Sequence, residues 1–273
     1  MMANSLVQEG DSIDYTPAAA VAAGAVVVQN GLVGVTQRDI AAGDLGSLRI
    51  EGVIDFDKTT GVSFAAGDPI YWDATNGLAT TVSVGNALIG RAVAAAGSSA
   101  TSVRGYLTTL AGQPTLLFSS VAASTAITNT TTQTAFDQAV TIPANVLKVG
   151  DIIRVRCQGI ATATNSTDTL NATVRLGTTD IVATGAIDVA NNDIFVIEVD
   201  IVIRTIGATG TLVAAGFTAI GAAGTATARP QFKASTAVDT TAALSVNTTA
   251  TWSVANAGNS CRLDVMNVQL IRR

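Results

Sequence analysis

Residues 7–35 read VQEGDSIDYTPAAAVAAGAVVVQNGLVGV, a short polar arm followed by two apolar runs that Asn30-Gly31 joins. A type I′ turn needs positive φ at both central residues, and Asn followed by Gly adopts it readily. The flanking runs, Val26 to Val28 and Leu32 to Val35, have the β-branched character of strands. This stretch therefore predicts an arm and then a β-hairpin.

A short Ala-Gly element recurs in the first half of the chain, at Ala23-Gly24, Ala42-Gly43 and Ala66-Gly67, each time before an apolar run. Gly supplies a turn conformation there, and an Asp that follows it can cap the turned backbone. Each copy therefore predicts a turn that precedes a strand. Asn76-Gly77 predicts a further hairpin turn.

Apolar and charged residues alternate from Leu48 to Asp57, which predicts a half-buried strand. Gly52 and Val53 interrupt the alternation in the middle of this strand. Strand-like pieces follow at residues 78–84, 87–94 and 102–110. The first half of the chain therefore predicts a small all-β barrel or sandwich.

At 273 residues the chain is longer than a typical single domain, so two domains are expected. Ala111-Gly112-Gln113-Pro114 places a Gly and a Pro close together, which ends one regular element before another begins. The expected domains are residues 1–112 and residues 113–273.

Alternation with a period of two residues is clearer in the second half. Together with less regular runs at residues 115–121, 211–220 and 261–271, the alternating runs give roughly eight strands separated by polar turns. This spacing predicts a two-sheet β-sandwich, with a jelly roll as the best single fold. The regular runs begin at Ile153, Leu170, Phe195 and Leu244.

Two details of these strands are also predicted. Arg154 and Arg156 share the outward face of one strand, and Glu198 and Asp200 share that of another. If the two strands are neighbours in one sheet, these residues form cross-strand ion pairs. In the last run the apolar phase shifts by one position near Val265, which predicts a β-bulge.

The charge of the chain argues against a nucleic-acid partner. The net charge is −5; residues 1–112 hold ten acidic and five basic side chains, and residues 113–273 hold ten of each. Neither half has the basic excess that nucleic-acid binding needs. The most apolar windows, residues 17–28 and 211–224, are interrupted and too short for a membrane helix, so no membrane span is expected.

The first residues, MMANSLVQEGD, lack both the basic region and the apolar core of a signal peptide, so no export is expected. The chain has two cysteines, Cys157 and Cys261, and both follow the inward phase of their runs. They are therefore expected to be reduced thiols buried in the core.

The absence of His removes the commonest general base and the commonest metal ligand. The carboxylate pairs Asp55 with Asp57 and Glu198 with Asp200 suggest a glycosidase, but solvent-facing charge explains them better. Residues 188–193, DVANND, carry four oxygen-bearing side chains that suit Ca²⁺, and a polar turn explains them equally well.

Residues 207–210, GATG, are too short for a phosphate-binding loop, and they predict a hairpin turn instead. From these motifs we expect no enzyme, no catalytic residue, no cofactor and no metal.

Five segments of the first half share a resemblance to a known family: VQEGDSIDYTPAA, AAGAVVVQNGLVGV, DIAAGDLGSLRIEGVIDF, FAAGDPIYWDATNGLAT and NALIGRAVAAAG. In order and without large gaps, they resemble the bacteriophage capsid cement or head decoration proteins over about residues 3–110. More loosely, VTIPANVLKVGDIIRVRCQG, STDTLNATVRLG and DVANNDIFVIEVDIVIRTIGATG resemble β-sandwich modules that phages append to head and tail proteins.

The resemblance implies a structural virion protein that binds the outer surface of the head and stabilises it, with the major capsid protein as its partner. Symmetric lattice sites would favour a homotrimer, the C-terminal sandwich would project outward, and the protein would be made in the host cytoplasm. The alternatives are a phage tail or fibre component and an adhesion protein that binds a host-surface carbohydrate through the C-terminal domain.

The polar arm from Ala3 to Tyr15 is the expected capsid contact, because a terminal segment can order on binding. Tyr71 and Trp72 are also candidates for an interface, although core packing explains Trp72 at least as well. The expected contact residues are Asn4, Gln8, Glu9, Asp11, Asp14 and Tyr15.

Overall fold

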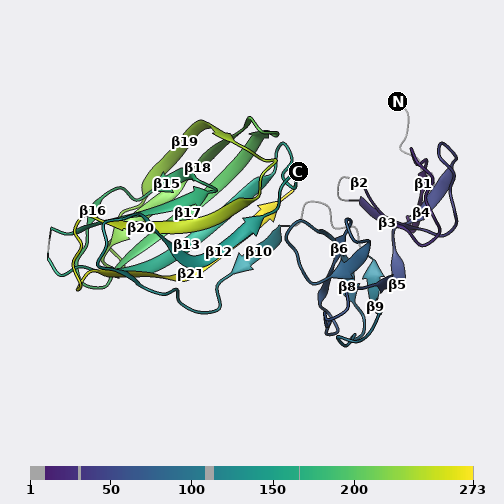
Figure 1. Cartoon of the computed structure of the whole chain (residues 1–273), viewed down its shortest axis with the longest axis horizontal. Helices are drawn as coiled ribbons and strands as arrows, with labels where there is room; N and C mark the ends of the chain where they lie inside the picture. Colours follow the sequence, from purple (N-terminus) through teal and green to yellow (C-terminus); the bar gives the residue numbers. More distant parts are fainter. Residues whose placement is uncertain (1–9, 30–31, 108–113, 166, 273) are drawn as a thin grey trace, which may run out of the picture. The chain divides into compact units, whose positions relative to one another are not determined.

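The computed structural model describes residues 10–29, 32–107, 114–165 and 167–272, and Figure 1 shows the whole chain. Every regular element in these ranges is a β-strand, which confirms the predicted all-β class. No helix among the described residues is long and apolar enough to span a bilayer. The internal contacts divide the chain into two compact units, residues 1–113 (unit 1) and 114–273 (unit 2). The predicted Asn30-Gly31 turn and residues 111–113 of the predicted boundary lie outside the described residues.

The first sheet of unit 1 has four antiparallel strands in the order β1-β4-β3-β2. β2 and β3 pair with Val28 opposite Val33, as the predicted hairpin requires. Residues 12–15 were expected to be part of the polar arm, but they form an edge strand, β1, that is hydrogen-bonded to β4. The strands are β1 (Ser12–Tyr15), β2 (Val26–Gln29), β3 (Leu32–Thr36) and β4 (Gly46–Arg49).

The second sheet of unit 1 has five strands in the order β5-β9-β8-β6-β7. The single strand predicted from Leu48 to Asp57 is wrong: it is two strands, β4 and β5, in different sheets. Gly52 begins β5 with φ 133°, a conformation that other residues rarely adopt. The strands are β5 (Gly52–Asp57), β6 (Pro69–Asp73), β7 (Leu78–Thr80), β8 (Ala87–Ala92) and β9 (Ser102–Leu107).

The turn at Asn76-Gly77 joins β6 to β7, as predicted. Gly77 has φ 66° and its N–H donates to the carbonyl of Asp73 at 2.8 Å. The Asp73 carboxylate also accepts from the backbone N–H groups of Thr75 and Asn76. The side-chain N–H₂ of Asn76 donates to the same carboxylate at 2.7 Å. This side-chain bond contributes most to holding the pKa of Asp73 below its ordinary value, and the backbone bonds add to it.

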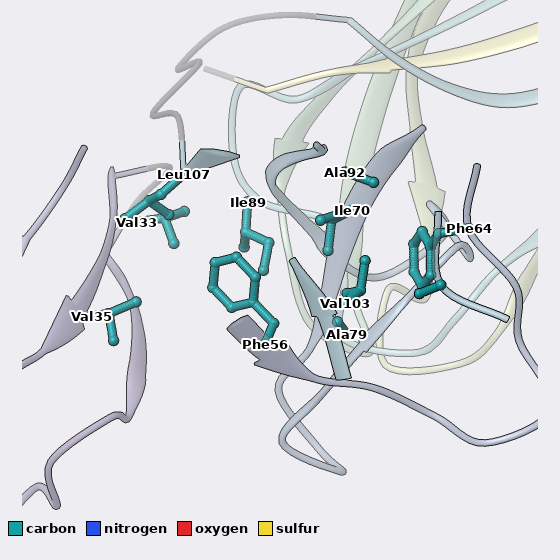
Figure 2. Close-up of a cluster of buried hydrophobic side chains, with 11 residues drawn as sticks. Val33, Val35, Phe56, Phe64, Ile70, Ala79, Ile89, Ala92, Val103 and Leu107 are labelled. Atoms are coloured by element: carbon teal, nitrogen blue, oxygen red, sulfur yellow. The ribbon is translucent and has the colours of Figure 1, made fainter. Parts of the chain in front are cut away.

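One buried cluster joins the two sheets of unit 1 (Figure 2). Val33 and Val35 of β3 lie in the same cluster as Phe56 of β5 and Ile89 of β8. Trp72 packs against this cluster with part of its surface exposed, so it belongs to the core. Unit 1 is therefore a small sandwich-like β domain in which this cluster holds the two sheets together.

The predicted Ala-Gly turns are confirmed, and a fourth copy joins them. In each copy a residue in an isolated β-bridge is followed by a four-residue turn and then by a strand. The glycines of the predicted copies, Gly24, Gly43 and Gly67, have φ of 80°, 80° and 92°. The bridges pair Val21 with Ile40 and Phe64 with Ala96. The turns close from Ala25 to Ala22, Asp44 to Ala41, Asp68 to Ala65 and Ala100 to Gly97.

Unit 2 has the strand order of a jelly roll. Its eight principal strands are β10, β12, β13, β14, β15, β17, β20 and β21, and they form sheets in the order β10-β21-β13-β17 and β12-β20-β14-β15. The hairpin β18-β19 extends the first sheet beyond β17, and the short strands β11 and β16 add to β21 and β14. This confirms the predicted fold.

The strands of unit 2 are teal to yellow in Figure 1. They are β10 (Thr115–Ser119), β11 (Ile127–Thr128), β12 (Thr134–Ile142), β13 (Ile152–Thr162), β14 (Thr169–Leu176), β15 (Thr179–Ala183), β16 (Ile187–Asp188), β17 (Asp193–Thr205), β18 (Gly210–Gly221), β19 (Arg229–Val238), β20 (Leu244–Trp252) and β21 (Ser260–Ile271).

The two sheets of unit 2 pack face to face through the inward residues of the alternating runs. The rings of Phe136 on β12 and Phe195 on β17 stack with centroids 6.3 Å apart. The hydroxyl of Thr248 on β20 donates to Sγ of Cys157 on β13 at 3.5 Å. Cys157 and Cys261 are free thiols and fully buried, as predicted.

The predicted bulge lies in β21. Gln158 of β13 is opposite Val265, whereas the next residue, Gly159, is opposite Leu263. Asp264 is therefore the extra residue, and it lets Leu263 and Met266 both face the core.

Candidate functional site

The predicted contact arm is described only in part. Asn4, Gln8 and Glu9 lie outside the described residues. Asp11 is exposed and directly precedes β1. Asp14 is exposed on β1 opposite Ser47, and Tyr15 is half-buried opposite Gly46.

Arg49 connects the residue before β1 to the residue before β5. Its Nη1 lies 3.3 Å from Oδ2 of Asp11, and its Nε donates to the carbonyl oxygen of Glu51 at 2.8 Å. A hollow of about 350 Å³ lies beside the Arg49 side chain. Its lining residues are Val35, Gln37, Arg49, Gly52, Val53 and Ile54.

Next to the hollow, β5 and β9 present an exposed aromatic and an exposed aliphatic side chain. Val53 and Tyr106 are cross-strand partners and are 57% and 42% exposed. The Tyr106 hydroxyl donates to Oε1 of Glu51 at 2.6 Å, and this bond raises the pKa of Tyr106 above its ordinary value. We call Asp11, Arg49, Glu51, Val53 and Tyr106 the Arg49 surface.

The composition of the Arg49 surface suits a protein partner. Tyr and Arg are enriched in protein–protein interfaces, and side chains held by intramolecular bonds lose less entropy on binding. Asp55, also on β5, is bound by both Nε and Nη2 of Arg104 at 2.8 Å, which lowers its pKa. Within this pair the two charges neutralise each other. Sequence reasoning missed Val53 and Tyr106, because no periodicity marks which exposed strand residues meet.

On unit 2, the outward face of the larger sheet carries the predicted ion pairs. Arg154 binds Asp200 through Nε and Nη2 at 2.7 and 2.8 Å, and Nε of Arg156 lies 2.9 Å from Oε1 of Glu198. Arg154 is opposite Asp200 and Arg156 is opposite Glu198 in the register of β13 and β17. The prediction of cross-strand pairs in one sheet is confirmed.

These pairs lie in the middle of two rows that cross the sheet, one residue per strand. A groove of about 670 Å³ follows the rows. We call it the two-row groove. From β10 to β19, the first row is Leu116, Gln269, Arg154, Asp200, Ala215 and Phe232, and the second is Ser119, Asn267, Arg156, Glu198, Phe217 and Pro230.

The other chemical candidates are engaged in local structure. The Asp193 carboxylate accepts from the backbone N–H of Ala190 at 2.8 Å, so residues 188–193, which were weighed as a calcium site or a polar turn, close on themselves as a turn. Within the described residues no three His, Cys, Asp or Glu side chains gather as metal ligands. Gly210 N–H donates to the carbonyl of Gly207, which confirms the predicted hairpin turn between β17 and β18.

Residues 7–107 match a family model described as phage cement protein, which confirms the resemblance seen in the sequence for this part of the chain. The match covers both sheets of unit 1. A comparison with curated proteins found no match.

Among solved structures, the chain is 10% identical to a lectin UEA-II complexed with galactose, with 81% of this chain and 98% of the lectin covered and a TM-score of 0.30. It is 9% identical to the infectious bursal disease virus VP2 subviral particle, with 96% and 70% covered and a TM-score of 0.30. Scores this low carry no argument about function.

Proposed function

We propose, on the premise that residues 7–107 match the phage cement family, that this protein binds the outer surface of a phage head and strengthens it. The family match is the observation that carries the proposal. The partner is the major capsid protein, and the protein is made in the host cytoplasm. It acts as a structural protein and not as an enzyme, because Asp55 on β5 and both carboxylates of the β17 pair, Glu198 and Asp200, are ion-paired with arginines.

The contact is made by the arm, with Asn4, Gln8, Glu9, Asp11, Asp14 and Tyr15, together with the Arg49 surface. Asp11 belongs to both, because it lies before β1 and pairs with Arg49. The ion pair orients the end of the arm beside Val53 and Tyr106, so a capsid subunit meets a partly ordered surface and less entropy is lost on binding.

Attachment is strengthened by assembly into a homotrimer through unit 1, with the sandwich of unit 2 pointing away from the head. Three-fold lattice positions favour a closed trimer. Three modest contacts made at once raise the effective concentration of each further contact, so avidity exceeds the affinity of one contact by orders of magnitude.

The test uses the full-length chain and undecorated heads, with co-sedimentation as the measurement. Tyr106→Ala combined with Val53→Ser should weaken binding at least tenfold, because it removes the aromatic and aliphatic contacts. Val82→Ser is the matched control, since Val82 is 54% exposed in the same unit but lies outside the Arg49 surface.

Equal binding of both variants and the wild type would remove the Arg49 surface from the contact. Binding to isolated tails, with none to heads, would favour the tail or fibre alternative. A monomeric mass both free and on the head would overturn the trimer.

A further inference from the structure

The two-row groove lies in unit 2, outside the unit 1 residues that are proposed to attach to the head. Its floor is the middle of a sheet, where β13 pairs with both β17 and β21 and β17 pairs with both β13 and β18. The backbone groups there are already used in the sheet. Recognition on this floor therefore depends on side chains.

The charges of the floor cancel. Arg154 and Arg156 face Asp200 and Glu198, two positive and two negative groups in two ion pairs. A ligand with a net charge would meet as much repulsion as attraction in the middle of the groove. The floor therefore favours an uncharged ligand.

The same side chains still have hydrogen-bonding capacity. Arg154 uses Nε and Nη2 on Asp200, which leaves Nη1 as a donor, and each carboxylate oxygen accepts more than one bond. The Ser119 hydroxyl donates to Oδ1 of Asn267 at 2.7 Å, which fixes that carboxamide with its N–H₂ group available. Gln269 adds a second carboxamide to the lining.

Donors and acceptors thus alternate along the groove in planar groups, a pattern that matches neighbouring hydroxyls of a sugar, which both donate and accept. Apolar groups flank this centre: Phe217 lines the groove, and Leu116 and Phe232 end the first row with 48% and 74% exposure. The C–H face of a pyranose ring packs well against such groups.

The size also fits a short chain of sugars. From β21 to β18 the floor crosses three interstrand spacings, about 14 Å. The volume of about 670 Å³ lies in the range of small-molecule sites.

We infer that the two-row groove binds an uncharged oligosaccharide that lies across the strands, with Gln269, Asn267, Arg154 and Arg156 and their paired carboxylates contacting its hydroxyls and Phe217 packing against a ring. A second copy of the chain is a poorer occupant, because a sheet-on-sheet contact would remove four charges from water. A peptide strand is also poorer, because it gains affinity from a free sheet edge, which this floor lacks.

The test is binding of the full-length protein to an array of neutral and anionic oligosaccharides, followed by calorimetry with the best soluble neutral ligand. Gln269→Leu should weaken binding at least tenfold. The double swap Arg156→Glu with Glu198→Arg keeps an ion pair but exchanges donor and acceptor positions, so it should also weaken binding at least tenfold. The melting temperatures of the Gln269→Leu variant and of the double swap should lie within about 4 °C of that of the wild type, because the changes are on an exposed face.

Arg262→Leu is the matched control, since Arg262 is on β21 but pairs with Asp264 outside the groove, and it should bind like the wild type. Capture of a neutral oligosaccharide that both groove variants lose would support the inference. Failure to bind any neutral oligosaccharide, binding of anionic ones alone, or binding that the double swap leaves unchanged would overturn it. Groove variants should still attach to heads, so this result is independent of the proposed head binding.

Discussion

At the residue scale, the two cysteines of unit 2 should make its stability depend on alkaline pH. Burial raises the pKa of Cys157 from an ordinary 9.0 to about 11 and that of Cys261 to about 12. The folded state thus favours the protonated thiol. The stability that Cys157 contributes is complete below about pH 9 and is lost as the pH rises through about 11.

We therefore expect the free energy of unfolding to fall by about 1.4 kcal/mol per pH unit for each thiol in this range. Urea unfolding followed by Trp252 fluorescence in a Trp72→Phe background measures it for unit 2. Cys157→Ala should make the free energy of unfolding fall less steeply with pH. The remaining pH dependence comes from Cys261. A variant with the same slope as its parent would contradict the prediction.

At the element scale, the bulge of β21 compensates the one-residue shift in the apolar alternation, so the apolar residues on both sides of it face the core. Deleting Asp264 should give a regular strand in which Leu263, Met266 and Val268 still face inward. The loss is the exposed pair of Arg262 with Asp264, which contributes about 0–1 kcal/mol.

Deleting Asn267 is the contrasting change, because it turns Gln269 toward the core and Leu270 toward water. We expect it to cost several kcal/mol more, on the order of a large core substitution. Chemical unfolding of the two deletion variants compares them. Equal destabilisation would mean that the bulge has a further role.

The patterns of apolar and polar residues within the strands determine which strands and turns could be predicted from the sequence. β13, β14, β17 and β20 bury one face each, so alternation predicted them, and with them the pairs of Arg154 and Arg156. The sequence did not locate β12, β15 and β19. The division of residues 48–57 could not be predicted, because a positive φ at Gly52 overrides an otherwise regular alternation. The fourth turn of unit 1, residues 97–100, was not predicted, because Ser99 stands at the position where the other three turns have Gly.

Neither candidate site could be predicted from the sequence, because each is formed by residues that only the fold brings together. The two-row groove brings β21 beside β13, strands that are distant in the sequence, and the Arg49 surface brings Asp11 beside residues of β5 and β9. Outward residues in strands show no pattern that assigns their neighbours. The sequence therefore predicted the ion pairs but neither the rows nor the groove.

At the scale of the whole molecule, the two units should divide the work. Residues 1–112 alone should bind undecorated heads in co-sedimentation, whereas residues 113–273 alone should not, because the family match lies entirely in unit 1. Circular dichroism of each fragment checks that its strands are intact. Head binding by residues 113–273 alone would reverse the assignment.

The four turns of unit 1 also make it a platform for display. At Gly24, Gly43, Gly67 and Gly97 no atom lies within 4 Å of where a side chain would begin, so each tip opens into free space. Peptides spliced into these tips lengthen a surface loop, which costs little closure entropy, and leave the paired bridges below untouched. A phage head bound by this protein as proposed would then carry foreign epitopes at a density set by the lattice of the head.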